Sequence, residues 1–109
     1  MPAGNKLVCG EIELDLGAAI VKKKGIQITL TAKEYKLLHI FMNKPKVLMK
    51  REEILRELTE DSEVFFDENT LSVYIKRVRE KIEDTPKEPE YIVTLRGLGY
   101  KWNKEVNKS

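Results

Sequence analysis

The sequence has very little of the chemistry from which most enzymes and metal sites are built. Its 109 residues include one cysteine, Cys9, and one histidine, His39. A single cysteine excludes an internal disulfide, and a zinc site made of cysteine and histidine needs more ligands than these two residues supply. Neither residue lies in a nucleophile motif, so no catalytic triad is indicated. We therefore expect a protein that is not an enzyme and that needs no metal or other cofactor.

Long apolar runs are lacking as well. No stretch approaches the roughly 18 apolar residues that a membrane helix needs, and no signal peptide opens the chain. Apolar residues make up 41% of the sequence and charged residues 35%, which is enough for one core beneath a highly charged surface.

The net charge of +2 suggests no partner, but its distribution along the chain does. Residues 52–68 carry eight acidic side chains and one basic one, whereas residues 69–82 and 91–109 each carry four basic side chains and one acidic one. Such polarity predicts one face for a polyanion and another face kept away from it.

The first thirty residues read as strands. Apolar and polar residues alternate from Val8 to Leu14, which predicts one half-buried strand with Cys9 on its outward face. Residues 18–23 and 26–30 predict two further strands around a turn, so we expect a small antiparallel meander.

Three helices should follow. Thr31 and Glu34 have the spacing of a capping box, which begins a first helix that ends at 43–45. A second helix is expected at about 50–58. A third should begin at the cap residue Asp67 and run to about residue 83.

The third helix has the pattern most informative about function. Four aliphatic residues recur at helical spacing and form a buried stripe: Leu71, Ile75, Val78 and Ile82. The outer face then carries Asn69, Val73 and Lys76, with Arg77 on its shoulder. Arginine pairs with guanine, asparagine with adenine, and valine can contact a thymine methyl group in the DNA major groove. An ordinary amphipathic helix with a solvated basic face would show the same pattern.

A hairpin with a basic tip closes the chain. Residues 91–95 and 100–103 read as strands around Arg96, Gly97 and Gly99. Glycine allows positive φ and close approach to another backbone, and an arginine on a thin ribbon can enter a narrow minor groove. The alternative is a tight turn with an incidental arginine, but a basic helix followed directly by a basic hairpin favours nucleic acid.

These segments resemble a known family. Residues 67–81 (DENTLSVYIKRVREK) and 91–102 (YIVTLRGLGYKW) resemble the recognition helix and wing of the OmpR/PhoB-type response-regulator DNA-binding domain, and 30–38 (LTAKEYKLL) resembles the start of its first helix. The resemblance implies an α+β winged helix-turn-helix with an N-terminal four-stranded antiparallel sheet, three helices and a C-terminal hairpin. It covers residues 7–103, with 1–6 as a flexible lead-in and 104–109 as a tail.

The resemblance also implies roles for individual residues. It places Arg77, with Val73 and Asn69, on bases in the major groove. Five residues would lie near phosphates: Lys76, Arg79, Lys81, Thr94 and Thr70. Arg96, with Gly97 and Gly99, would enter the minor groove, and an acidic loop with Glu60, Asp61 and Glu63 would face RNA polymerase. The chain departs from the family at Asn69, often arginine, and at Tyr74, often histidine.

The implied partners are double-stranded DNA and RNA polymerase. The DNA sites would be direct repeats, bound by tandem dimers of a domain that is monomeric in isolation. The resemblance also implies a cytoplasmic protein that does not contact a membrane. Family members carry a phosphorylated receiver domain of about 120 residues, for which this chain has no room, so we expect an excised effector domain or a natural stand-alone one. Two alternatives stay open: a module whose basic helix meets an acidic protein, and an RNA binder, although the A-form major groove is too narrow for a helix.

Overall fold

The computed structural model describes residues 5–59 and 68–108, excluding the side chains of residues 68 and 69. The first strands are β1 (Lys6–Cys9), β2 (Ile12–Asp15), β3 (Ile20–Lys23) and β4 (Ile26–Ile28). The helices are α1 (Ala32–Met42), α2 (Arg51–Thr59) and α3 (Glu68–Ile82). The remaining strands are β5 (Leu48–Met49), β6 (Ile92–Leu95), β7 (Gly99–Trp102) and β8 (Asn107–Lys108).

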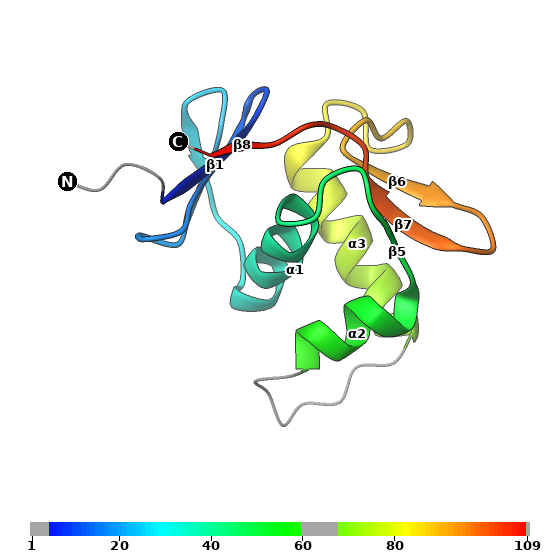
Figure 1. Ribbon diagram of the computed structural model, residues 1–109. Helices are drawn as coiled ribbons and strands as arrows, with labels where there is room; N and C mark the ends of the chain where they lie inside the picture. Colours follow the sequence, from blue (N-terminus) through cyan, green and yellow to red (C-terminus); the bar gives the residue numbers. More distant parts are fainter. Residues whose placement is uncertain (1–4, 60–67, 109) are drawn as a thin grey trace.

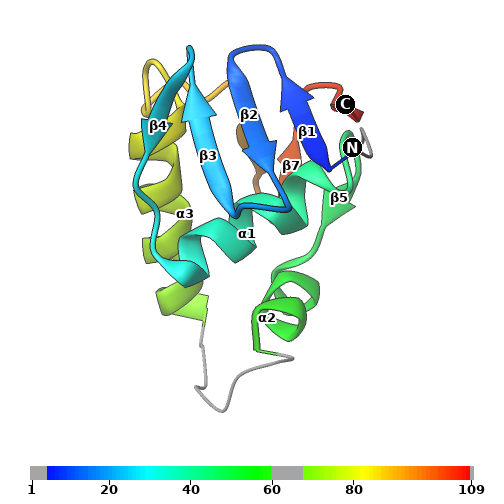
Figure 2. The ribbon, with the colours of Figure 1, turned by 90° about the vertical axis from the view of Figure 1, so that its left-hand side faces the viewer.

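The strands form two separate antiparallel sheets, with α1 and α3 between them (Figure 1). The N-terminal sheet has the order β4-β3-β2-β1-β8, and the second sheet has the order β5-β7-β6. Figure 1 shows the second sheet beside α3, and Figure 2 shows α1 passing behind the N-terminal sheet. The expected α+β order of strands, three helices and hairpin is confirmed.

The N-terminal sheet is larger than expected because the end of the chain returns to it. Asn107 pairs with Val8 and Lys108 with Leu7, so β8 becomes a fifth strand at the edge of the sheet. The segment that we expected to be a tail therefore closes the edge of β1, whose backbone groups would otherwise be unpaired.

The expectation that Cys9 points outward is wrong. Residues 8–14 do not form one strand, because the chain reverses at Gly10 and Glu11 to give the hairpin of β1 and β2. Cys9 lies opposite Ile12 in this hairpin, and residues that pair directly across a ladder share one face. Both are buried, and burial raises the pKa of the Cys9 thiol more than Trp102 and Lys104 lower it.

The capping box of α1 is confirmed. The Thr31 hydroxyl accepts a hydrogen bond from the Glu34 backbone N–H at 3.2 Å, and a Glu34 carboxylate oxygen accepts one from the Thr31 N–H at 3.0 Å. This exchange satisfies backbone donors at the helix start. It also fixes the rotation of α1 that buries the apolar stripe of Leu37, Leu38 and Phe41.

The apolar stripe of α3 is buried as its spacing predicted. Leu71, Ile75, Val78 and Ile82 are each at most 1% exposed. They join one core that also contains Trp102 from β7, whose ring lies 5.3 Å from that of Tyr91. The expected cap residue, Asp67, lies outside the described residues. Burying this stripe fixes which face of α3 is left for a partner.

Candidate nucleic-acid interface

The outer face of α3 is exposed and basic. Val73, Lys76, Arg77 and Glu80 are all exposed, on the side of the helix opposite its buried stripe. Val73 is 45% exposed, which is unusual for an apolar residue on a helix whose other aliphatic side chains are buried. A convex helix surface with cations and a small apolar side chain matches what the major groove of B-DNA presents.

Arg77 stands out on this face because its guanidinium has a support. Its central carbon lies 5.5 Å from the centre of the Tyr74 ring, within the range of a cation–π contact. The contact restricts the arginine side chain while leaving it exposed, which lowers the side-chain entropy that would be lost when its guanidinium binds a partner.

The hairpin of β6 and β7 presents Arg96 at its tip. The turn is closed by a hydrogen bond of 2.8 Å from the Leu98 N–H to the Leu95 carbonyl, and Gly97 has φ +79°, which glycine adopts readily. Arg96 is exposed and Leu98 is 61% exposed. Figure 1 shows the loop between β6 and β7 projecting away from the rest of the molecule.

Gly99 makes a close approach inside the protein, and its expected place at the minor groove stays a prediction. Its φ is +149°, and a Cβ there would run into the carbonyl oxygen of Met49 and crowd Lys50. The glycine therefore lets the wing strand β7 approach the backbone that leads into α2. The close approach that we expected at this glycine is made within the protein.

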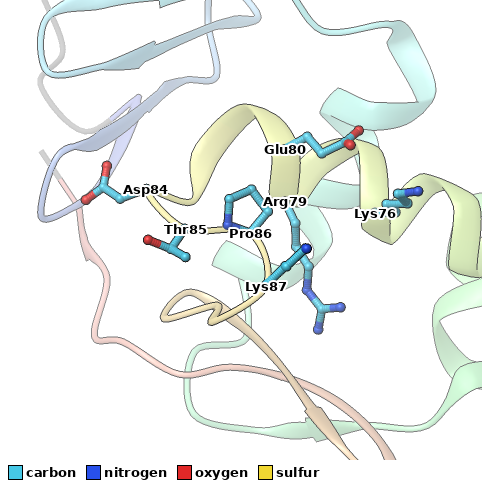
Figure 3. Close-up of a pocket in the computed structure, with 7 residues that line it drawn as sticks. All are labelled: Lys76, Arg79, Glu80, Asp84, Thr85, Pro86 and Lys87. Atoms are coloured by element: carbon cyan, nitrogen blue, oxygen red, sulfur yellow. The ribbon is translucent and has the colours of Figure 1, made fainter.

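A hollow of about 500 Å³ lies between α3 and the loop that follows it (Figure 3). The residues that line it are Lys76, Arg79, Glu80, Asp84, Thr85, Pro86 and Lys87. Lys23 lies 2.8 Å from the Asp84 carboxylate and neutralises it, which leaves the hollow basic. Lys87 was not among the residues expected at the interface, because it lies between the predicted third helix and the predicted hairpin, outside both basic elements.

Comparison with known proteins identifies the family. The family described as "Transcriptional regulatory protein, C terminal" matches residues 25–102, which include all three helices and the wing. The chain belongs to this family. It is a family of transcription regulators and not of enzymes.

Individual relatives agree with this assignment. The chain is 41% identical over 101 residues to the transcriptional regulatory protein YcbL of Bacillus subtilis (strain 168), covering 92% of this chain and 44% of YcbL. It thus spans less than half the length of that relative. The response regulator DrrB of Thermotoga maritima, an OmpR/PhoB homologue, has a TM-score of 0.82 at 30% identity, over 91% of this chain and 44% of DrrB. The RstA DNA-binding domain of Klebsiella pneumoniae, solved in complex with the RstA box, has a TM-score of 0.79 at 25% identity, over 90% of this chain and 96% of that domain.

Arg79 of this OmpR/PhoB-type domain has internal partners that the sequence did not reveal. Its Nε donates a hydrogen bond of 3.0 Å to the Ile92 carbonyl, and Nη2 donates one of 2.7 Å to the Thr94 hydroxyl. The guanidinium also lies 5.8 Å from the centre of the Tyr100 ring. Burial lowers its pKa, but an arginine remains charged. Its phosphate contact stays a prediction, and the structure adds a contact to the wing.

Lys81 is likewise engaged inside the domain. Its Nζ lies 2.6 Å from a carboxylate oxygen of Glu34, which is buried at the start of α1. Burial alone would raise the pKa of Glu34, but Lys81 and the Thr31 N–H outweigh it and lower that pKa. Lys81 therefore ties α3 to α1, and its expected contact with a phosphate stays a prediction.

This ion pair gives a pH-dependent prediction. Because the folded pKa of Glu34 is lowered, its stabilising contribution is present above the ordinary glutamate pKa near 4.5 and is lost as the pH falls through the lowered value. We expect Glu34→Gln, which can keep the cap, to lower the free energy of unfolding by about 2 kcal/mol at neutral pH. Urea unfolding followed by Trp102 fluorescence should show this difference shrinking below about pH 4.5. A difference independent of pH would contradict the assignment.

Several expected site residues receive no structural description. The side chain of Asn69 and the acidic residues Glu60, Asp61 and Glu63 lie outside the described part of the chain. Among the residues that are described, no group of acidic, histidine and cysteine side chains is placed to hold a metal ion. None of the helices in that part is long and apolar enough to cross a membrane.

Proposed function

We propose that this domain binds a defined double-stranded DNA site as the effector domain of a two-component response regulator that controls transcription. The observation that carries the proposal is the exposure of two basic elements, the outer face of α3 and Arg96 at the tip of the hairpin whose strand β6 is hydrogen-bonded to Arg79 of α3. Helix and hairpin pack on one core, so they can engage adjacent grooves together. The family and the RstA complex with its DNA support this function.

In this proposal α3 reads the major groove. Arg77 contacts a guanine through its two-pronged guanidinium, Val73 contacts a thymine methyl group, and Asn69 contacts an adenine. The exposed Lys76 and the two hydroxyl residues Thr70 and Thr94 contact phosphates, which set the register without reading sequence. Lys87 extends this phosphate-facing surface along the hollow beside α3.

The wing would engage the minor groove next to the α3 site. Arg96 supplies the cation, and the turn at Gly97 keeps the tip thin enough to enter. The groove is narrowest, and its potential most negative, in A·T-rich DNA.

The remaining partners also belong to this proposal. The domain binds direct repeats as a tandem dimer, and in a longer chain a receiver domain would raise the local concentration of the second copy. The acidic residues Glu60, Asp61 and Glu63 face RNA polymerase, which their charge supports because an acidic segment is poorly suited to phosphate. The site of action is the cytoplasm.

Selection of bound sites from a random duplex library tests the function most directly. We expect the selected sites to share a motif that occurs twice in one orientation, and footprinting to protect bases in that motif. Recovery of random duplexes, with no defined protection, would favour the alternative of an interaction module for an acidic protein. RNA should compete poorly, since a helix cannot enter its deep major groove.

Replacing Arg96 by alanine tests the wing. We expect a loss of affinity of about tenfold, which corresponds to one charge-assisted contact of about 1.5 kcal/mol, when the flanking minor groove is A·T-rich. The loss should be smaller on sites with G·C-rich flanks. Binding titrations on paired duplexes that differ only in the flank measure this, and an equal loss on both would remove Arg96 from the minor groove.

A further inference from the structure

Glu83, the residue that follows α3, is a buried acid that binds the backbone of another element. Glu83 is only 4% exposed. One carboxylate oxygen accepts hydrogen bonds from the N–H groups of Glu90 at 2.7 Å and Tyr91 at 3.1 Å. The other accepts from Tyr91 at 3.0 Å and Ile92 at 2.9 Å. Glu83 therefore holds the chain at the point where β6 begins.

Arg79, four residues earlier on the same side of α3, holds the next part of that strand. The two side chains meet at Ile92, whose N–H donates to Glu83 and whose carbonyl accepts from Arg79. Arg79 then reaches Thr94, two residues before Arg96 at the tip. Together the two side chains bind backbone groups of Glu90, Tyr91 and Ile92 and the hydroxyl of Thr94, along one edge of β6.

This edge needs partners because β6 is the outer strand of its sheet. The sheet order is β5-β7-β6, so only one edge of β6 pairs with a strand. Backbone groups on a free edge are satisfied by water or by side chains. The side chains of Arg79 and Glu83 meet part of that need here, which makes the angle between α3 and the wing depend on them.

We propose that Glu83 is a positioning residue, which together with Arg79 fixes the wing relative to α3 and so determines where Arg96 lies when Arg77 is in the major groove. The contacts of Glu83 and Arg79 with residues 90–92 and Thr94 are called the clamp below. The proposal rests on the proposed function, because the clamp would set the spacing between two DNA-reading elements. Glu83 itself contacts no DNA, and its effect on binding passes through Arg96.

The charge of Glu83 makes the proposal easy to distinguish from simple electrostatics. Neutralising an acid near a polyanion strengthens binding, because repulsion of the phosphates falls. Loss of the clamp weakens binding, because the wing no longer holds Arg96 in place. Glu83→Gln is therefore expected to weaken binding, whereas Glu88→Gln, a matched change at an exposed residue of the loop that follows α3, should leave binding unchanged or tighten it.

The first experiment needs no DNA. Amide hydrogen exchange should show faster exchange at Tyr91 and Ile92 in Glu83→Gln, while amides of the buried α3 stripe keep their protection. Unchanged exchange at Tyr91 and Ile92 would overturn the clamp. If the clamp is present but the unmodified domain protects no DNA site, the proposed function fails and the structural role of Glu83 stands.

The second experiment is a double-mutant cycle on the selected DNA site, at fixed salt and at a temperature where every variant is folded. We expect Glu83→Gln to weaken binding about fivefold alone and to have little further effect when Arg96 is already alanine. An equal loss in both backgrounds would overturn the coupling, as would tighter binding.

Arg79→Lys provides a second route if Glu83→Gln does not fold. Lysine keeps the charge but cannot bind Ile92 and Thr94 with the same fork. We expect it to weaken binding and to show the same coupling to Arg96, with the salt dependence otherwise unchanged. Full retention of affinity by Arg79→Lys would mean that this position acts only as a cation, and would overturn its part in the clamp.

Discussion

Replacing Arg77 by alanine is expected to weaken binding to the specific DNA site by about 1–3 kcal/mol, which is roughly 5- to 150-fold in the dissociation constant. The guanidinium is exposed on the outer face of α3 and rests on the Tyr74 ring, so it is available and already restricted in direction. A two-pronged contact with guanine is lost in the variant, and discrimination at one base pair should be lost with it. Nonspecific binding should change much less.

Two further variants separate recognition from charge. Arg77→Lys keeps the positive charge but not the planar fork, so it should lose most of the discrimination while nonspecific affinity stays close to that of the unmodified domain. Lys22→Ala, on β3 in the N-terminal sheet, removes one cation away from α3 and should have little effect. Titrations on the selected site, on single-base variants of it and on random duplex measure these changes. Equal weakening on specific and random DNA would remove Arg77 from the bases.

The largest expected effect on stability comes from Gly99→Ala. The substitution should lower the free energy of unfolding by about 3 kcal/mol, because it adds overpacking to backbone strain. A Cβ at this position meets the backbone of Met49 and Lys50, which cannot move aside as the end of a flexible side chain can. Relief requires β7 to separate from the segment that leads into α2, and that would disturb the pairing of Met49 with Tyr100.

Gly97→Ala is the matched control for this change. Gly97 also has positive φ, but a Cβ there meets nothing within 4 Å, so its cost is backbone strain alone, about 1 kcal/mol. Denaturant unfolding reported by Trp102, the one tryptophan in the sequence, compares the two variants. Similar losses of stability in both would show that the contact with Met49 is not what requires glycine at position 99.

The elements that the sequence predicted well are those whose signals are local. The capping box at Thr31 and Glu34 predicted the start of α1, and the spacing of Leu71, Ile75, Val78 and Ile82 predicted the buried face of α3. Helical periodicity needs no knowledge of the rest of the chain. The exposed positions of Val73, Lys76 and Arg77 follow directly from that buried face.

The strand prediction at residues 8–14 failed because it also relied on a local pattern, the alternation of apolar and polar residues. Alternation with period two continues through a two-residue hairpin turn, so the pattern alone did not show that the chain reverses at Gly10. Once it reverses, Cys9 pairs with Ile12 and moves to the buried face. The position of a turn decided the environment of the cysteine.

The amino-acid sequence by itself determined the order of strands, three helices and hairpin, the family and the basic face of α3, because these depend on residues close together in the chain. Tertiary structure alone decided the partners of Arg79, Lys81, Glu83 and Gly99. Lys81 meets Glu34 across 47 positions, and Gly99 meets Met49 across a gap that contains two helices. Contacts over such separations arise only when packing brings distant segments together, and no local pattern encodes them.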